Sequence, residues 1–264
     1  LIAIGGGITQ DISSFVASIL FRGIKWKFIP TTLLAQGDSC IGGKTSINFL
    51  GYKNQLGNFY PPDQIYIDTK FILGLKDSDL YSGVGEMAHY FFVDSKKMYN
   101  FFLNKYEKAL KRDTDAINVL VYNALQIKKK FIEKDEFDQN ERLILNYGHT
   151  YGHAIETSSN YKIPHGISVS YGMDISNFVS YRLGFIDKTL FHQMRNCLKK
   201  IYKRKLPKKI KTKSLVDALR KDKKNIDSNL RFIATKGLGK MFIHKIPFNK
   251  KFIQIIDDYL MMDI

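Results

Sequence analysis

Three histidines in one stretch of the chain have the spacing of metal ligands. His149 and His153 lie in the segment NYGHTYGHAIE at residues 146–156, and His165 follows directly after Pro164. Residues four apart share one face of a helix, so the first two imidazoles would point the same way. A carboxylate lies upstream at Glu86, in GEMAHY. Three nitrogen and oxygen donors around an open position are what a catalytic zinc ion needs, so this set predicts an enzyme.

The surroundings of the histidine pair are polar and rich in glycine. A glycine precedes each histidine, at a cost of about 1 kcal/mol each relative to alanine in a helix, so we expect another segment to approach closely there. Arg142, Asn146, His149 and His153 follow one another at spacings of four, three and four, which predicts all four on one face of a single helix. The alternative is structural, with one histidine in the core and one exposed. It explains the polar face less well, because each buried polar group needs a partner.

Length and composition fit a globular protein with a sizeable core. The chain has 264 residues, of which 44% are hydrophobic, and no apolar run approaches the roughly 18 residues that cross a bilayer. Its two cysteines, Cys40 and Cys197, give no disulfide framework, so we expect a reducing compartment, the cytoplasm. The chain opens on Leu1 inside a strand-like run. We interpret it as a fragment whose natural start, with any targeting segment, is missing.

The formal net charge of +16 allows nucleic acid, an anionic small substrate or a lysine-rich surface as its explanation. The densest basic stretch, residues 199–213, has nine Lys and Arg but one aromatic residue, Tyr202. Nucleic-acid platforms add stacking aromatics or a recognisable module. We therefore expect a solvated face there and no nucleic-acid partner. Basic residues near the glycine motifs suit a phosphorylated substrate better.

Two parts with different periodicity follow each other along the chain. Residues 1–75 indicate an α/β arrangement, with strands at 1–4, 25–30 and 64–68 and a helix at 12–20. Residues 76–264 indicate a mainly α-helical part, with helices at 77–93, 96–110, 113–134, 140–159, 166–182 and 187–202. A strand pair at 230–235 and 240–246 and a closing helix at 248–261 complete it. The boundary falls near residues 70–76, and a cleft between two such parts favours an active site.

Two glycine motifs of the first part could bind anions. Three glycines at residues 5–7 lie between a strand and a helix, where backbone N–H groups suit a pyrophosphate, although a plain tight turn fits as well. Gly42, Gly43, Lys44 and Thr45 resemble the end of an ATPase phosphate loop, but Asp38 stands where that motif needs its first glycine. We read this motif, and a similar one before Lys53, as turns that present a lysine to an anion. Chance surface lysines remain the alternative.

The order and spacing of the motifs resemble dehydroquinate synthase and the related sugar-phosphate cyclases. The matching segments run over nearly the whole chain: GGGITQD at 5–11, FRG at 21–23, PTTLLAQGDSCIGGKTSIN at 30–48, YKNQLGNFYPP at 52–62, GEMAHY at 85–90, LNYGHTYGHAIE at 145–156, HG at 165–166 and DKKN at 222–225. A family member begins well before Leu1. The resemblance therefore makes residues 1–75 the C-terminal portion of an α/β NAD-binding domain and residues 76–264 a metal- and substrate-binding domain.

The resemblance assigns roles to individual residues. The metal ligands, for zinc or another divalent ion such as cobalt, are Glu86, His149 and His165. The NAD contacts are Gly6, Gly7, Ile8, Thr9, Gln10, Asp11, Thr31, Thr32, Lys44, Lys53, Phe71, Ile72, Leu73 and Gly74. The catalytic and substrate-binding residues are Asp38, Lys44, Asn54, Lys128, Arg142, Asn146, His153, Lys223, Lys224 and Arg22. Arg22 matches an arginine that reaches a neighbouring subunit, which implies a homodimer, and no membrane partner is implied.

The implied reaction converts a seven-carbon sugar-acid phosphate to dehydroquinate. NAD oxidises a secondary alcohol, phosphate leaves by β-elimination, the hydride returns, and the opened enol closes by aldol addition. Four residues depart from the usual family pattern: His89 stands for lysine, Ile167 for glutamate, Gly74 for threonine and Asp138 for glutamate. The alternatives are therefore a cyclase of the same family with a different substrate, or a non-catalytic paralogue.

Overall fold

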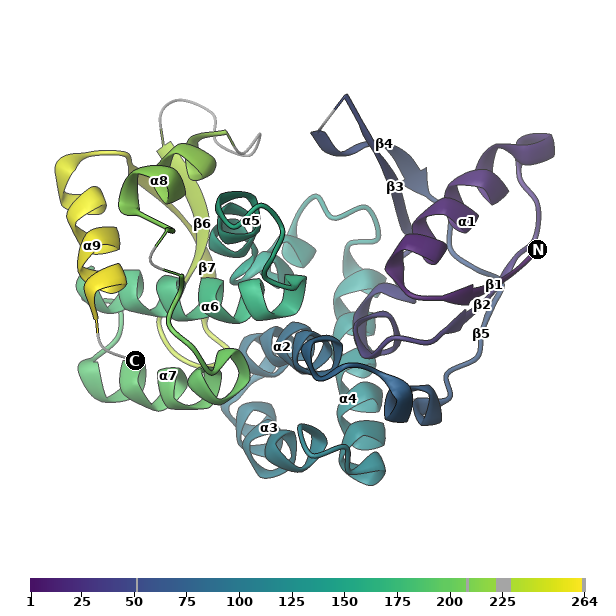
Figure 1. Ribbon diagram of the computed structural model, residues 1–264, viewed down its shortest axis with the longest axis horizontal. Helices are drawn as coiled ribbons and strands as arrows, with labels where there is room; N and C mark the ends of the chain where they lie inside the picture. Colours follow the sequence, from purple (N-terminus) through teal and green to yellow (C-terminus); the bar gives the residue numbers. More distant parts are fainter. Residues whose placement is uncertain (51, 208, 222–228, 263–264) are drawn as a thin grey trace. The chain divides into compact units, whose positions relative to one another are not determined.

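The computed structural model describes residues 1–50, 52–207, 209–221 and 229–262, and at Asn48, Tyr52 and Lys53 it describes the backbone only (Figure 1). The chain forms two compact units. The first contains Leu1–Met87 and Lys105–Arg142, and the second contains Ala88–Asn104 and Leu143–Ile264.

A parallel sheet and one helix form the α/β part of the first unit. Strands β1 (Ile2–Gly5), β2 (Lys27–Pro30) and β5 (Gln64–Ile65) pair in parallel in the order β1-β2-β5. Helix α1 (Gly7–Ile19) begins two residues after β1 and connects it to β2. The hydrophobic core of this part contains Ala3, Ala17, Trp26 and Phe28. The α/β expectation for the start of the chain is confirmed.

Two further pieces of the first unit place the glycine motif. A π-helical turn, Ala35–Ser39, follows β2, and β3 (Lys44–Phe49) and β4 (Tyr52–Phe59) then form an antiparallel hairpin that the sequence analysis did not predict. Gly42 and Gly43 have φ of 99° and 66°, so the predicted turn before Lys44 is present and needs residues without a side chain. Helix α4 (Thr114–Lys134) belongs to this unit, and α2 (Asp77–Asp94) runs from it into the second unit.

The second unit is mainly helical, as expected. Its helices, besides the end of α2, are α3 (Lys96–Ala109), α5 (His149–Ser158), α6 (His165–Arg182), α7 (Lys188–Tyr202), α8 (Thr212–Arg220) and α9 (Lys250–Met261). Strands β6 (Asn229–Thr235) and β7 (Met241–Pro247) form the predicted antiparallel pair. Helix α6 is buried nearly all round, whereas α8, which the sequence analysis missed, is short and packs along one face only.

Two local predictions are wrong. The single helix expected over residues 140–159 is divided into a 3₁₀ turn, Glu141–Asn146, and α5, because Gly148 takes a left-handed conformation with φ of 84°. Arg142 and Asn146 therefore do not share a helix face with His149 and His153. The helix expected at residues 12–20 begins earlier than predicted, at Gly7.

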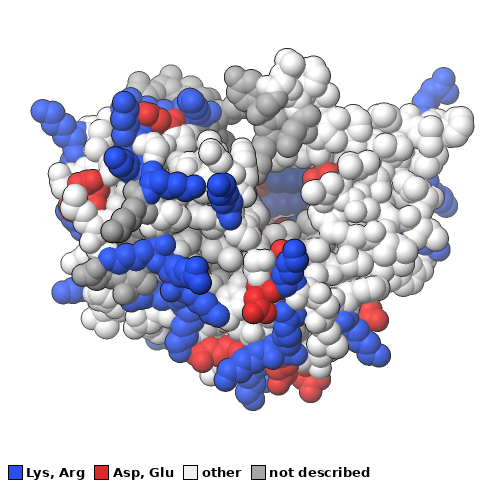
Figure 2. All heavy atoms as spheres, viewed as in Figure 1, with Lys and Arg blue, Asp and Glu red and all other residues white. Residues whose placement is uncertain are grey.

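The basic stretch of the second unit is a solvated surface. Lys200 within α7 and Lys203, Arg204 and Lys205 after its buried end are exposed. Figure 2 shows Lys and Arg spread over the face that carries α7, α8 and α9. This agrees with the expected solvated face. Among the described residues, no helix is both long and apolar enough to cross a membrane.

A buried acidic group links three helices of the second unit. Asp174 on α6 has no exposed surface, and its carboxylate accepts hydrogen bonds from the hydroxyls of Tyr202 on α7 (2.9 Å) and Tyr259 on α9 (2.8 Å). Arg195 of α7 lies 3.7 Å from it and over the Tyr259 ring. Burial raises the pKa of Asp174, and the charge of Arg195 opposes that shift. The network fixes α7 and α9 against α6.

We expect Asp174→Ala to lower the free energy of unfolding by about 3–5 kcal/mol, because it leaves the Arg195 charge buried without its partner. Asp258→Ala is the matched control. It removes the Asp258–Arg182 ion pair, whose side chains are 31% and 35% exposed, and should cost far less, because exposed ion pairs contribute little to stability. Urea denaturation measures both, and equal losses would contradict the special role of the buried group.

Candidate active site

The histidine motif folds around a close contact between α5 and α6. A Cβ built on Gly172 of α6 would lie 2.7 Å from the amide nitrogen of Gly152 and closer still to the carbonyl oxygen of Gly148. A Cβ on Gly148 would meet Met173 Cγ at 2.6 Å and the carbonyl oxygen of Val169 at 2.8 Å. The close approach that the glycines predicted is confirmed: α6 is the segment that needs it.

This contact brings the histidines together. His149 begins α5, His153 follows one turn later, and His165 begins α6. The ring centroids of His149 and His165 lie 5.5 Å apart, and those of His153 and His165 lie 5.6 Å apart with the rings stacked. Because His165 is the first residue of α6, any change in how α6 lies against α5 moves its imidazole.

Helix α2 supplies the acidic partner. Its residue Glu86 is 2% exposed, and each of Glu86, His149 and His165 offers a ligand atom within 4.8 Å of the others. One turn after Glu86, the buried His89 packs edge-on against His149, with ring centroids 5.2 Å apart. Helix α2 thus carries both Glu86 and a residue that contacts a second member of the set.

The donor set fits a zinc ion. Two imidazoles and one carboxylate are a ligand combination of catalytic zinc sites, which keep a further position for water or substrate. The Nδ1 atom of His149 lies 3.4 Å from the carbonyl oxygen of Tyr147. A carbonyl can only accept, so Nδ1 carries the proton and the Nε2 lone pair is the one available to a metal.

Glu156 is an acidic residue of this region that the sequence analysis passed over. It is 5% exposed, and its Oε2 lies 3.2 Å from Nδ1 of His165. His153, Glu156 and His165 form a second set of possible ligands within 4.8 Å of one another. A signal was present in the sequence, because Glu156 follows His149 by seven residues and His153 by three, on the same helix face.

The basic residues of the first unit gather around the Gly42 turn. Lys128 on α4 donates from Nζ to both the carbonyl oxygen and Oδ1 of Asp38, each at 2.7 Å. The guanidinium of Arg142 donates to the carbonyl oxygens of Glu136 (2.5 Å) and Gly42 (3.2 Å). Both cations are buried, so their positions are set by these acceptors before any ligand binds.

The remaining candidate substrate-binding residues differ in exposure and in hydrogen-bond partners. Lys44, half exposed at the start of β3, pairs with Asp138. Asn54 on β4 accepts a hydrogen bond from Ser46, and Asn146 donates to the carbonyl oxygen of Leu143 within its 3₁₀ turn. Arg22 is exposed after α1. Lys223 and Lys224 lie outside the described residues, and so does the side chain of Lys53.

The glycine turn after β1 fits a dinucleotide phosphate. Gly6 precedes α1, and a Cβ there would lie 2.8 Å from Thr32 Cγ2, whereas a Cβ on Gly7 would meet nothing within 4 Å. Thr31 donates its N–H to the carbonyl oxygen of Gly5. These candidates therefore meet at the carboxyl ends of β1 and β2, where open parallel sheets bind nucleotides, and the first N–H groups of α1 can face an anion.

The other NAD candidates have mixed exposure. Phe71 and Leu73 of the 3₁₀ turn Thr69–Gly74 are 43% and 54% exposed, but the Ile72 side chain is fully buried. Among the residues after Gly7, Gln10 is buried and bonded to Ser39, while Ile8 is 80% exposed. Asp11 accepts from the N–H of Ser46 at 3.4 Å, and burial raises the pKa of its carboxyl. Thr9 is half-buried beside Gly5.

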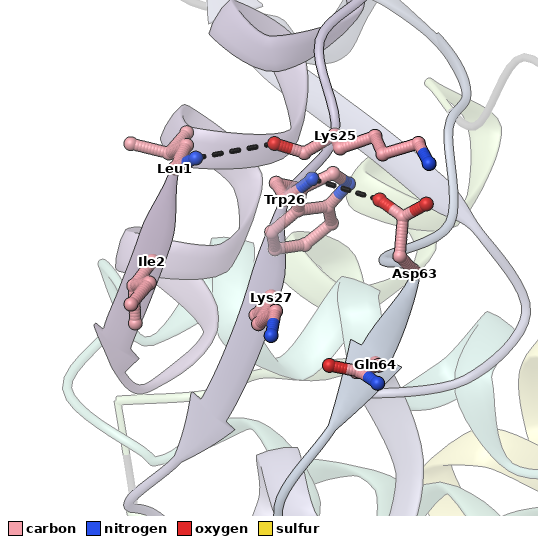
Figure 3. Close-up of a pocket in the computed structure, with 7 residues that line it drawn as sticks. All are labelled: Leu1, Ile2, Lys25, Trp26, Lys27, Asp63 and Gln64. Atoms are coloured by element: carbon pink, nitrogen blue, oxygen red, sulfur yellow. Dashed lines mark hydrogen bonds between the residues drawn. The ribbon is translucent and has the colours of Figure 1, made fainter.

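A cavity of about 430 Å³ opens elsewhere in the first unit (Figure 3). Its lining includes Leu1, Lys27 and Gln64, at the amino ends of the three parallel strands, together with Trp26 and Asp63. Ligands of open α/β sheets bind at the carboxyl ends of the strands. The cavity is therefore at the opposite end from the glycine turn and is not a candidate for the nucleotide site.

Two family models of 3-dehydroquinate synthase match most of this chain. The model of the 3-dehydroquinate synthase N-terminal region matches residues 1–82, and that of the C-terminal region matches residues 83–225. The 3-dehydroquinate synthase of Thermodesulfovibrio yellowstonii is 40% identical over 246 residues, which are 92% of this chain and 68% of that protein. The corresponding protein of Clostridium tetani is 39% identical over 254 residues, 95% of this chain and 67% of that protein.

Solved structures share the fold at lower identity. A 2-deoxy-scyllo-inosose synthase complexed with carbaglucose-6-phosphate, NAD⁺ and Co²⁺ matches with a TM-score of 0.88 and 23% identity, over 97% of this chain and 73% of that one. The 2-epi-5-epi-valiolone synthase of Streptomyces hygroscopicus, with NAD⁺ and Zn²⁺ bound, matches with a TM-score of 0.86 and 22% identity, over 98% of this chain and 72% of that one. The fold of this chain is thus one that these two synthases share.

We expect Gly172→Ala to destabilise the chain, although alanine favours a helix by about 1 kcal/mol over glycine. The added methyl group meets backbone atoms of α5, so α6 must move and carry His165 away from His149. Thermal unfolding should show a fall in the melting temperature. Gly74→Ala is the control, because a Cβ there meets nothing within 4 Å. A Gly172→Ala variant as stable as the parent would show that the helix contact is not tight.

Proposed function

The chain belongs to the 3-dehydroquinate synthase family, and we propose that it is an NAD- and zinc-dependent cyclase converting a seven-carbon sugar-acid phosphate to dehydroquinate with loss of phosphate. The observation that carries the proposal is the convergence of Glu86, His149 and His165, whose ligand atoms lie within 4.8 Å of one another. The cyclases of this fold described above hold NAD⁺ and a divalent metal, which supports the same pair of cofactors here.

Two sets of residues would hold the cofactors. Glu86, His149 and His165 would bind the metal, and the glycine turn before α1, with Thr31, Thr32 and residues 71–74, would bind NAD. When bound, NAD takes and returns a hydride at a secondary alcohol, and zinc withdraws electrons from the oxygen at that carbon. The functional division remains part of the proposal: residues 1–75 bind NAD, and residues 76–264 contribute the metal ligands.

Three cations of the first unit, two of them buried, recognise the anionic groups of the substrate. Lys44, Lys128 and Arg142 bind its carboxylate and phosphate. Because two carbonyl oxygens already orient the Arg142 guanidinium, its remaining N–H groups are fixed in direction and suited to a bidentate contact with an oxyanion. Asp38 orients Lys128 rather than acting as a base, since its carboxylate is bonded to that ammonium group.

His153 moves the proton that phosphate elimination requires. It lies one turn after His149 on α5 and stacks on His165, so its imidazole is next to the metal ligands without belonging to the ligand set. A neutral imidazole can take up a proton near neutral pH and return it to the departing phosphate oxygen or to the enol. Asn54 and Asn146 offer amide groups for hydroxyls of the substrate.

The proposed assembly is a homodimer. Arg22 is exposed next to Phe21, which is 86% exposed, and Ile12 and Ile19 on α1 are 54% and 60% exposed. Exposed apolar residues grouped on one face are typical of an interaction surface. This supports contact with a second copy at the end of α1, where Arg22 would reach the partner.

The test of the function is phosphate release. We expect the protein, supplied with NAD and Zn²⁺, to release inorganic phosphate from the seven-carbon sugar-acid phosphate that precedes dehydroquinate. A chelator should abolish release, and Zn²⁺ or Co²⁺ should restore it. His149→Ala should lower kcat at least about a thousandfold, because metal polarisation is worth several kcal/mol. Thr157→Ala, on an exposed position of the same helix, serves as the control. Metal binding without phosphate release from this substrate would favour a cyclase of different specificity.

The His89 position tests the substrate. His89 is 1% exposed and packs on His149, where family members carry lysine, and Ile167 replaces an acidic residue in the first turn of α6. The loss of one cation and one anion together indicates a matched change in recognition. We expect the double variant His89→Lys with Ile167→Glu to raise kcat/KM for the dehydroquinate precursor, mainly by lowering KM. His89→Lys alone should help less, because it buries an unpaired charge. A parent protein as efficient as the double variant would contradict a shifted pocket.

A further inference from the structure

Glu156 contacts His165 at Nδ1, the ring nitrogen that would not bind the metal. Its Oε2 lies 3.2 Å from Nδ1 of His165, and its side chain is 7% exposed. A carboxylate at this distance favours the proton on Nδ1, which leaves the lone pair of the neutral ring on Nε2. At His149 the carbonyl oxygen of Tyr147 lies beside Nδ1 in the same way. Both imidazoles therefore have an oxygen acceptor next to Nδ1, which favours the same tautomer in each.

The loop before His165 is fixed by the same residue. The backbone carbonyl of Glu156 accepts hydrogen bonds from Tyr161 N (2.7 Å) and from the Ser159 hydroxyl (3.0 Å). The backbone of Glu156 thus sets the start of the segment that leads to α6, while its side chain sets the ring of the first α6 residue. Both the position and the orientation of His165 depend on one turn of α5.

The two possible ligand sets compete for His165. His165 belongs to both sets. Because Glu156 lies beside Nδ1, we assign Nε2 to the set with Glu86 and His149, and a metal held between Glu156 and Nδ1 would need the other tautomer. A neutral imidazole has one lone pair, so it serves one set at a time. The short Glu156–Nδ1 contact favours the tautomer that serves Glu86 and His149.

We propose that Glu156 is a positioning residue for the metal site: it accepts the Nδ1–H of His165, which orients the ring and presents Nε2 to the metal. The inference rests on the proposed function, since it assumes a metal at Glu86, His149 and His165. Hydrogen bonds from ligating histidines to a carboxylate raise the basicity of the ligand, and removing the acceptor weakens metal binding about 10- to 100-fold.

The test measures metal affinity rather than activity alone. Metal-free parent, Glu156→Ala, Glu156→Gln and Thr157→Ala are titrated with Zn²⁺ against a chromophoric chelator, and with Co²⁺ while its visible absorption bands are recorded. Glu156→Ala should bind Zn²⁺ about 10- to 100-fold more weakly, with altered Co²⁺ bands. Glu156→Gln keeps an acceptor oxygen, so its affinity should stay closer to the parent than to the alanine variant. Thr157→Ala should bind like the parent.

The other outcomes separate the inference from the function. If the parent binds no metal, the proposed function fails and the inference with it. If the parent binds one ion and Glu156→Ala binds it equally well, the inference alone is overturned. If Glu156→Gln is as weak as Glu156→Ala, or if the bound Zn²⁺ falls from two ions to one, Glu156 is a ligand and not a positioning residue. Unfolding of the metal-free variants shows whether any loss of affinity follows from a loss of structure.

Discussion

The contact between the backbones of α5 and α6 is the constraint on which the rest of the metal site depends. Gly148, Gly152 and Gly172 face one another with no room for a Cβ at Gly172, and Gly148 takes a left-handed conformation at the point of contact. Glycine lowers the stability of a helix, and the close packing of the α5 and α6 backbones offsets this loss. This contact has two consequences. Helix α5 begins at His149, and α6 begins at His165, whose imidazole lies against α5. A donor set that requires sub-ångström placement is thus held by backbone contact, which is stiffer than contact through flexible side chains.

Helix α6 in turn is fixed from its other side. Asp174, nine residues after His165, binds the hydroxyls of Tyr202 and Tyr259 and lies beside Arg195. A buried charge with three partners tolerates few alternative packings, so the orientation of α6 is determined at both of its contacts. His165, one of the three proposed metal ligands, is the first residue of this helix, where a small rotation would produce the largest displacement. The polar core of the second unit therefore serves the site although none of its members belongs to the site.

In the first unit, the candidate substrate-binding cations are also held in place by the fold, here through hydrogen bonds. Lys128 and Arg142 are buried, and their acceptors are largely backbone carbonyls together with Asp38. Asp135 completes the arrangement, because its carboxylate accepts the N–H groups of Gln139, Asn140 and Arg142. Cations that are fixed before an anion arrives lose little conformational freedom on binding it. Parallel pairing of β1 and β2 adds the glycine turn and the threonines at one edge of the sheet. The candidate substrate-binding residues of this unit thus come from α4, from the strands β3 and β4 and from the turns next to them.

The sequence alone predicted most of the helices, the family and a candidate set of metal ligands. Helical periodicity placed most helices to within one or two residues, the glycines around the histidines predicted a close approach, and the motif order predicted the family and the donor set. Features that depend on packing between elements could not be predicted from local patterns. A regular spacing from Arg142 to His153 suggested one helix, but the approach of α6 requires Gly148 in a left-handed conformation, and the helix is broken there. The β3–β4 hairpin lacks clean alternation, and β3 packs against α1, where the Thr45 hydroxyl donates to the carbonyl oxygen of Asp11. The contact of Lys44 with Asp138 joins residues 94 apart, and that of Glu156 with His165 crosses from one helix to the next. Spacing along a chain fixes which residues share a face; only packing between elements fixes which faces meet, because that depends on the shapes of both.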